Sequence, residues 1–155
     1  MTVSTSGVPL GSCGSCGSRS ARTGGERVAL AKYLLDSDVV IAWLRRDDDV
    51  VGWLKERDAA GDVLGWTPIS IAEIGAGVRP REAFILSDLA RVLHCIELDE
   101  RVGRKAGTYR LRFGRSHGVE IADALIAAAA HVHGLTLCTR NLRHYPMRDI
   151  KKRRV

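Results

Sequence analysis

The sequence predicts an α/β domain in which a small, mostly parallel sheet is flanked by helices. From Val28 onward, short apolar runs alternate with segments of helical periodicity, and strands separated by helices tend to pair in parallel. The 155 residues suffice for one compact domain and a tail. A hydrophobic fraction of 45% and a charged fraction of 27% are typical of a soluble globular protein. We therefore expect one domain over residues 28–150.

The expected strands are short apolar segments bounded by polar or turn-forming residues. The first of them ends at Asp36, and Ile150 is a candidate for a last, weak strand. The other strands alternate with helices, as a parallel sheet requires. The predicted strands cover residues 28–35, 63–66, 95–98 and 135–139.

The expected helices show apolar residues at helical spacing. Pro80 ends one of them because proline cannot continue a helix, and Gly134 is a favourable residue just after the Ala-rich one. Residues 114–118 are expected to form a loop. The predicted helices cover residues 39–44, 50–60, 71–78, 82–93, 100–113 and 121–133.

The two ends of the chain are expected to lie outside this domain. Residues 1–27 are rich in Gly and Ser and poor in apolar side chains, which predicts a disordered extension. Residues 151–155 are expected to form a basic C-terminal tail. No signal-peptide pattern and no apolar run of roughly 18 residues is present, so we expect a cytoplasmic protein without a membrane partner.

The cysteines do not predict a disulfide framework. Cys13 and Cys16 form a CxxC pair that lacks two further zinc ligands nearby. Cys95 and Cys138 lie in apolar stretches and are expected to be buried.

Positive charge concentrates near the C-terminus. The formal net charge is +6, and residues 140–154 contain seven Lys or Arg residues against one acid. A basic surface attracts polyanions such as nucleic acids. A solubilising role for these charges remains an open alternative.

Polar residues follow the predicted strands at one edge of the sheet. Because the carboxyl ends of parallel strands lie at one edge, where ligands bind, we expect side chains that are far apart in sequence to meet there. Some have simpler roles, as a helix N-cap at Asp36 or Asp38, a capping box from Ser70 to Glu73, or a turn at Asn141. The residues at this edge are Asp36, Asp38, Glu73, Asp123, Thr139 and Asn141.

Asp123 is the acid for which a structural role is most costly. Its neighbours are almost all apolar, and no Lys or Arg lies three or four residues away to pair with it. Converging carboxylates stay ionised together if a cation binds them, and hard oxygen ligands select Mg²⁺ or Mn²⁺. Such an ion polarises a phosphoryl oxygen and activates water, which implies a phosphodiester or phosphate substrate.

Four ordered motifs resemble those of the PIN-domain family. They are YLLDSD at 33–38, ISIAEI at 69–74, IADALIAA at 121–128 and LCTRN at 137–141. Within that family the chain is similar to the VapC toxins of bacterial toxin–antitoxin pairs, over roughly residues 32–145. The resemblance implies a three-layer domain, a Mg²⁺- or Mn²⁺-dependent ribonuclease, RNA as substrate, an antitoxin partner and a homodimer.

Site roles follow from the same resemblance. Asp36, Glu73 and Asp123 match the catalytic acids, and Asp36 and Asp123 match metal ligands. Asp38 and Thr139 match supporting positions. Asn141 stands where many members place a fourth acid, which favours one firmly held metal over two.

Three alternatives remain open at this point. The Asp-x-Asp pattern at 36–38 is also the opening motif of haloacid dehalogenase-type phosphatases, in which the first Asp is a nucleophile. The chain could also be a non-catalytic binding module on the same fold, or a PIN nuclease acting in RNA maturation. The metal mechanism does not require the histidines, which are expected at the surface or in packing: His117, His131, His133 and His144.

Overall fold

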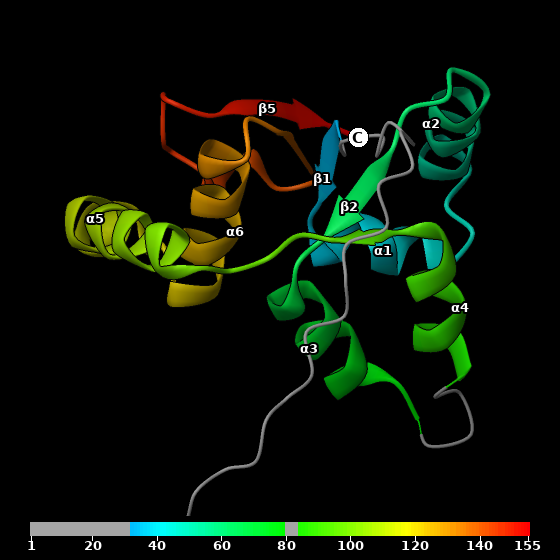
Figure 1. The fold of residues 1–155 in the computed structure, drawn as a ribbon, viewed down its shortest axis with the longest axis horizontal. Helices are drawn as coiled ribbons and strands as arrows, with labels where there is room; N and C mark the ends of the chain where they lie inside the picture. The colour runs from blue at the N-terminus through cyan, green and yellow to red at the C-terminus, as the bar shows by residue number, and fades with distance from the viewer. Residues whose placement is uncertain (1–31, 80–83) are drawn as a thin grey trace, which may run out of the picture.

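The computed structural model describes residues 32–79 and 84–155 and shows an α/β fold with a parallel sheet (Figure 1). The expected disordered extension, the start of the first predicted strand and the start of the 82–93 helix lie outside the described residues. The sheet has five parallel strands in the order β3-β2-β1-β4-β5. Their bounds are β1 Tyr33–Leu35, β2 Leu64–Trp66, β3 His94–Cys95, β4 Thr136–Thr139 and β5 Lys151–Arg154.

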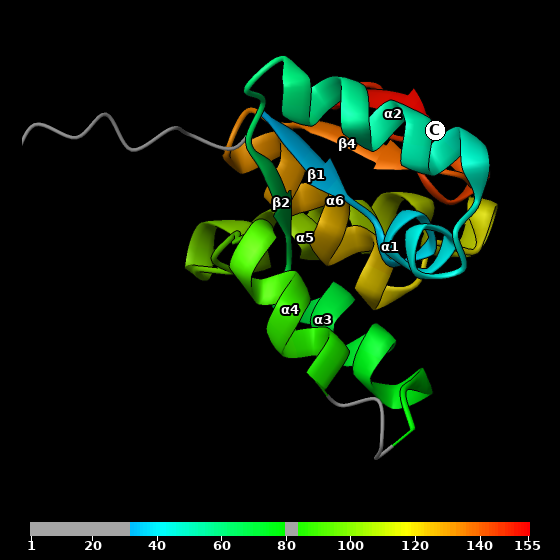
Figure 2. The same ribbon diagram turned by 90° about the vertical axis from the view of Figure 1, so that its right-hand side faces the viewer.

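Helices cover both faces of the sheet and complete the predicted three-layer architecture (Figures 1 and 2). Successive residues of a strand face opposite sides, so Leu34 packs with α5 and α6, whereas Tyr33 and Leu35 pack with α1 to α4. The helices are α1 Ser37–Leu44, α2 Asp48–Ala59, α3 Pro68–Gly77, α4 Phe84–Val92, α5 Glu100–His117 and α6 Ile121–Val132, with a short 3₁₀ helix, η2, at Leu142–His144.

Several helices begin earlier than predicted because a polar side chain caps them. Asp36 caps α1, so that helix starts at Ser37. Thr67 caps α3, with Pro68 in the first turn, where its missing N–H costs nothing. At its other end α5 continues to His117 and stops at Gly118, whose φ of 67° is left-handed. The predicted loop at 114–118 is therefore wrong except at its last residue.

The expectation of a C-terminal tail at 151–155 is also wrong. Lys151–Arg154 is strand β5 and pairs in parallel with β4, from Thr136↔Lys151 to Thr139↔Arg154. A strand at the edge of a sheet pairs on one side only, so its residues stay largely exposed and need no apolar pattern. Arg153 also lies over the ring of Trp53 at 5.7 Å, a cation–π contact that holds the strand to α2.

The two described cysteines differ in environment. Cys138 is buried in β4, as predicted, whereas the prediction for Cys95 is wrong because it is exposed on β3, at the edge of the sheet. None of the helices within the described ranges is long and apolar enough to cross a membrane.

Candidate active site

Asp36 lies at the end of β1 with its carboxylate bound on both oxygens. Oδ1 accepts a hydrogen bond of 2.8 Å from the Ser37 backbone N–H, and Oδ2 accepts one of 2.8 Å from the Tyr145 hydroxyl. The side chain is buried, and burial, together with the nearby charge of Asp38, raises the pKa of Asp36 to about 6. The two hydrogen bonds oppose that rise because they favour the charged form. Asp36 is thus both a helix cap and a buried carboxylate with a raised pKa.

Asp38 connects the start of α1 to the end of β4. Its Oδ2 accepts hydrogen bonds from Thr139 Oγ1 at 3.1 Å and from the Arg140 backbone N–H at 2.9 Å. Thr139 Oγ1 also accepts from the Asn141 N–H at 3.0 Å, so one hydroxyl sets the path of the chain after β4. Asp38 Oδ1 is buried and has no hydrogen-bond partner within the described residues. An unsatisfied buried carboxylate oxygen is costly, and a bound cation would satisfy it.

Asp123 stands in the first turn of α6, where it forms a capping box with Glu120. Its Oδ2 accepts from the Glu120 backbone N–H at 3.2 Å, and the Glu120 side chain accepts in return from the backbone at Asp123. Burial raises the pKa of Asp123, while that hydrogen bond and the charge of His144 lower it. The capping box and the nearby His144 thus offset part of the burial cost that the sequence analysis expected a cation to offset.

Glu73, unlike Asp123, has no capping role. The capping box considered for Ser70 to Glu73 does not form, because Thr67 rather than Ser70 is the cap of α3, with Thr67 Oγ1 accepting from the Ser70 N–H at 3.1 Å. Glu73 is exposed and makes no hydrogen bond within the part of the chain that the structure describes. A helix-capping role thus applies to Asp123 and not to Glu73.

The predicted acids line a single cavity of about 370 Å³ at the carboxyl edge of the sheet, which we call the acid cavity. It brings together residues from the end of β1, α1, α3, the connection between α5 and α6, α6 itself and the segment after β4. Of the six predicted side chains only Thr139 is absent from the wall, since it lies buried behind Asp38. The lining residues are Asp36, Ser37, Asp38, Glu73, Gly118, Glu120, Ala122, Asp123, Asn141 and His144.

His144 is a wall residue that the sequence analysis assigned only to the surface or to packing. Its Nε2 lies 3.0 Å from Asn141 Nδ2, and its Nδ1 lies 3.7 Å from Asp123 Oδ1. If the Asn141 amide donates, the neutral ring carries its proton on Nδ1, toward Asp123. The Asn141-x-x-His144 spacing across η2 is the sequence signal that could have indicated this contact.

Tyr145 is the second site residue that sequence reasoning missed. It is fully buried, and its hydroxyl donates to Asp36. Burial, followed by the charge of Asp36, raises the pKa of Tyr145, so the hydroxyl stays protonated and remains a donor. The sequence contains no local signal for this contact, because the two residues are 109 positions apart.

The donors of the acid cavity suit a hard divalent cation. They are mainly carboxylate oxygens, with one amide, one hydroxyl, one imidazole and no thiolate, and Asp38 Oδ1 lacks a partner within the described residues. As the side chains lie, however, no three His, Cys, Asp or Glu residues within 32–79 and 84–155 are grouped to hold a metal ion. The cavity thus fits such a cation in donor type.

Comparisons with known proteins identify the family of the chain. A family model for the PIN domain matches residues 33–150. Ribonuclease VapC10 of Mycobacterium tuberculosis is 36% identical over 115 residues, which cover 74% of this chain and 86% of that protein. Ribonuclease VapC19 of the same organism is 30% identical over 115 residues, covering 74% of this chain and 92% of that protein.

Solved structures show the same fold. The crystal structure of VapBC2 from Rickettsia felis, bound to a promoter DNA fragment, aligns with a TM-score of 0.69 at 19% identity, over 79% of this chain and 98% of that one. FitAcB from Neisseria gonorrhoeae aligns with a TM-score of 0.58 at 25% identity, over 77% of this chain and 95% of that one. The family match, rather than the Asp-x-Asp motif shared with phosphatases, decides the assignment: the chain belongs to the PIN-domain family.

Proposed function

We propose that this chain is a Mg²⁺- or Mn²⁺-dependent endoribonuclease and the toxin of a toxin–antitoxin pair. The observation that carries the proposal is the convergence of Asp36, Glu73 and Asp123, from three separate elements, on one cavity. Relatives at 30–36% identity are named as ribonucleases, which supports RNA as the substrate. Acids alone would repel a phosphodiester, so the cavity needs a cation to act on one.

Asp36 and Asp123 are the proposed ligands of that cation, with Glu73 completing the acid set. A divalent ion bound there would supply the positive charge that polarises a phosphoryl oxygen and lowers the pKa of a water molecule. Ser37 and Tyr145 hold the Asp36 carboxylate in one orientation before substrate arrives. Asn141 contributes no charge, which supports one firmly held cation.

The direct test is incubation of the full chain with structured RNA and Mg²⁺ or Mn²⁺. We expect cleavage that EDTA abolishes and that added Mn²⁺ restores. Asp123→Asn should reduce cleavage at least 100-fold, since a metal ligand contributes several kcal/mol to the transition state. Asp58→Asn, an exposed acid on α2, is the matched control and should leave cleavage unchanged. Cleavage in EDTA, or full activity of Asp123→Asn, would refute the mechanism.

The antitoxin and the homodimer are part of the same proposal. Similar folds are found in VapBC toxin–antitoxin structures, which supports a protein partner for this chain. Expression of the chain alone should arrest growth, and co-expression of a small neighbouring gene should relieve the arrest. A PIN nuclease of RNA maturation would cleave one RNA species without arresting growth. Sedimentation equilibrium should give twice the mass of the chain.

A further inference from the structure

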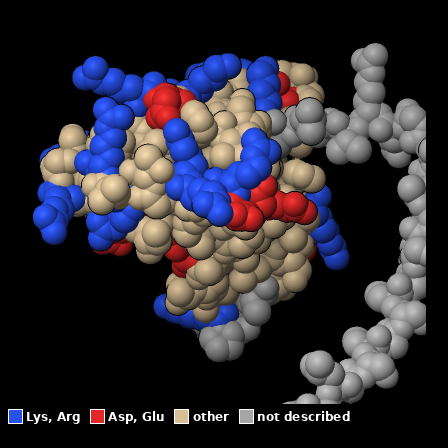
Figure 3. All heavy atoms as spheres, turned by 60° about the vertical axis from the view of Figure 1, so that its left-hand side comes forward, with Lys and Arg blue, Asp and Glu red and all other residues tan. Residues whose placement is uncertain are grey.

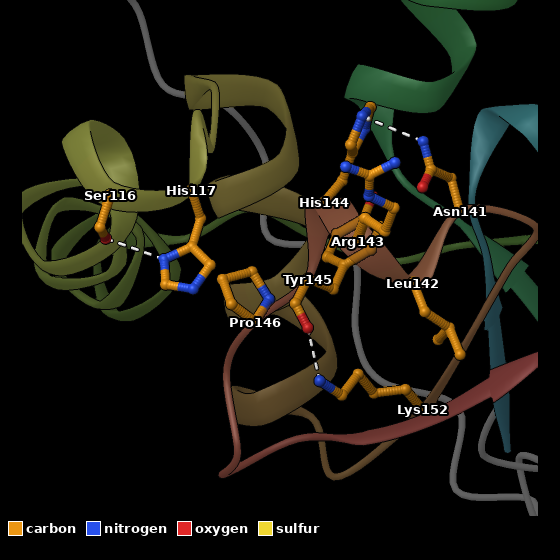
Figure 4. Close-up of a pocket in the computed structure, with 9 residues that line it drawn as sticks. All are labelled: Ser116, His117, Asn141, Leu142, Arg143, His144, Tyr145, Pro146 and Lys152. Atoms are coloured by element: carbon orange, nitrogen blue, oxygen red, sulfur yellow. Dashed lines mark hydrogen bonds between the residues drawn. The ribbon is translucent and has the colours of Figure 1, made fainter.

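Two further cavities continue from the acid cavity along one side of the molecule. The first, of about 690 Å³, lies between the end of α5, the 141–146 segment and β5, and shares Asn141 and His144 with the acid cavity (Figure 4). The second, of about 490 Å³, runs along α5 and shares His117 and Pro146 with the first. Because neighbouring cavities share wall residues, the two adjoin each other and lead away from the acids. We call these two cavities together the α5 groove.

The α5 groove has the opposite charge to the acid cavity. Its one acid, Asp149, is already paired with Lys105 at 2.7 Å and accepts a hydrogen bond from Tyr109 at 2.9 Å. Arg143 and Arg148 are exposed and have no ion-pair partner within the described ranges. Figure 3 shows Lys and Arg side chains spread over this side of the molecule, with acidic groups between them. The cationic wall residues are Lys105, Arg112, Arg143, Arg148 and Lys152.

Rings lie among these cations. Phe113 and His117 line the groove with their ring centroids 5.8 Å apart in an edge-to-face arrangement. Ser116 Oγ lies 2.8 Å from His117 Nδ1, which orients the imidazole and leaves Nε2 without a partner in the described residues (Figure 4). Arg112 lies over the Phe113 ring at 5.1 Å. Cations that track a backbone, interleaved with rings on which bases stack, are the features of single-strand binding surfaces.

We propose that the α5 groove binds the single-stranded part of the RNA substrate on one side of the cleaved bond. Phosphates would contact Arg143 and Arg148, and a base would lie against Phe113 and His117. This inference rests on the proposed ribonuclease function. It adds the direction in which the bound RNA strand extends, because the groove lies on one side of the acid cavity. A protein segment that neutralised the acids would carry positive charge, which the groove would repel, whereas RNA matches its charge.

The first test measures binding without catalysis. The full chain in EDTA is titrated into a fluorescein-labelled single-stranded 12-mer RNA, and anisotropy is followed at several salt concentrations. Arg143→Ala with Arg148→Ala should weaken binding about 10-fold and reduce the slope of log K against log[salt] by about 1.4, from about 0.7 per lost phosphate contact. The control pair, Lys55→Ala with Arg91→Ala on α2 and α4, removes the same charge from exposed positions that do not line the groove and should weaken binding less than about twofold.

The second test uses cleavage to check direction. RNAs shortened from the 5′ side and from the 3′ side of the cleaved bond are compared in Mn²⁺. Wild type should lose kcat/KM when the RNA on one side of the cleaved bond is removed and keep it when the other side is removed. The double variant Arg143→Ala with Arg148→Ala, which we call the groove pair, should show the same kcat/KM whichever side is removed. Thermal melts of all variants show whether they fold, and both substituted arginines are exposed.

The outcomes separate the two proposals. Equal losses in the groove and control pairs, or equal sensitivity to both flanks, would overturn the α5 groove proposal and indicate diffuse attraction. A groove pair that binds RNA normally but no longer binds a co-expressed protein partner would also overturn it and assign the groove to that partner. In each of these cases wild type still cleaves RNA. If wild type cleaves no RNA in Mg²⁺ or Mn²⁺, the ribonuclease function itself fails.

Discussion

The buried hydroxyl of Tyr145 donates a hydrogen bond of 2.8 Å to Asp36 Oδ2 and so fixes the acid that follows β1. Asp36 is 8% exposed, and its pKa is raised to about 6 even with this hydrogen bond in place. The contact works in two ways. It sets the orientation of the carboxylate, and it favours the charged form that a cation needs.

Tyr145→Phe should therefore weaken cation binding without altering the acids themselves. Loss of the donor raises the pKa of Asp36 further, so we expect about 10-fold weaker Mn²⁺ binding at pH 6 and a smaller loss at pH 8, where the carboxylate is ionised in either protein. Isothermal titration calorimetry at the two pH values measures this. Tyr109→Phe is the matched control, because it removes a Tyr–Asp hydrogen bond of 2.9 Å to Asp149, away from the acid cavity. Equal losses in both variants would contradict a role specific to Asp36.

The raised pKa of Asp36 makes the metal-free protein less stable as pH rises. Between about pH 4 and about pH 6 the folded state binds more protons than the unfolded state, whose Asp36 has its ordinary pKa of 3.8. The contribution of this group is full below that range and is lost as pH rises through the folded pKa, by about 3 kcal/mol at most.

Urea unfolding in EDTA from pH 4 to pH 8 tests this linkage. Asp36→Asn cannot titrate, so its free energy of unfolding should lack the decrease that wild type shows across this window. The difference between the two proteins isolates Asp36 from the other carboxyl groups. Parallel curves for the two proteins would show that Asp36 has an ordinary pKa in the folded state.

Asn141→Asp should change how many cations the acid cavity binds. Asn141 lies in the wall beside the acids, and its amide adds no negative charge. A fourth carboxylate supplies the charge that a second cation requires, so we expect the Mn²⁺ stoichiometry to rise from one to two in calorimetric titrations. In EDTA the same variant should be less stable than wild type, because the added charge repels Asp36 and Asp123. Two ions bound to wild type would contradict the single-cation interpretation.

Removal of residues 151–155 should destabilise the protein, because they form β5 and not a free tail. The truncation leaves β4 without its partner strand and removes the contact between Arg153 and Trp53. We expect a loss of about 2–4 kcal/mol in the free energy of unfolding, from several backbone hydrogen bonds and one cation–π contact. Lys151→Gln with Arg154→Gln removes charge but keeps the strand, and should cost less than about 0.5 kcal/mol each. No effect of the truncation would restore the interpretation as a tail.

The sequence contained enough to predict the α/β fold and most of the acid cavity. Strand and helix types follow from local periodicity, and strand ends place Asp36, Asp38 and Asn141 at one edge of a parallel sheet. Its largest failures, strand β5 and the contact between Tyr145 and Asp36, depend on partners distant in sequence. β5 has no apolar pattern because it is an edge strand, and its existence depends on the free side of β4.

What the sequence by itself determined is therefore the order of the elements and the chemistry of the cavity: carboxylates after strands, suited to a hard cation. Only the tertiary structure decided which histidine faces Asp123 and which hydroxyl holds Asp36. Periodicity and capping are local properties that a short segment already expresses. The hydrogen bond between Tyr145 and Asp36 spans 109 residues and exists because the packed sheet and helices bury both groups together.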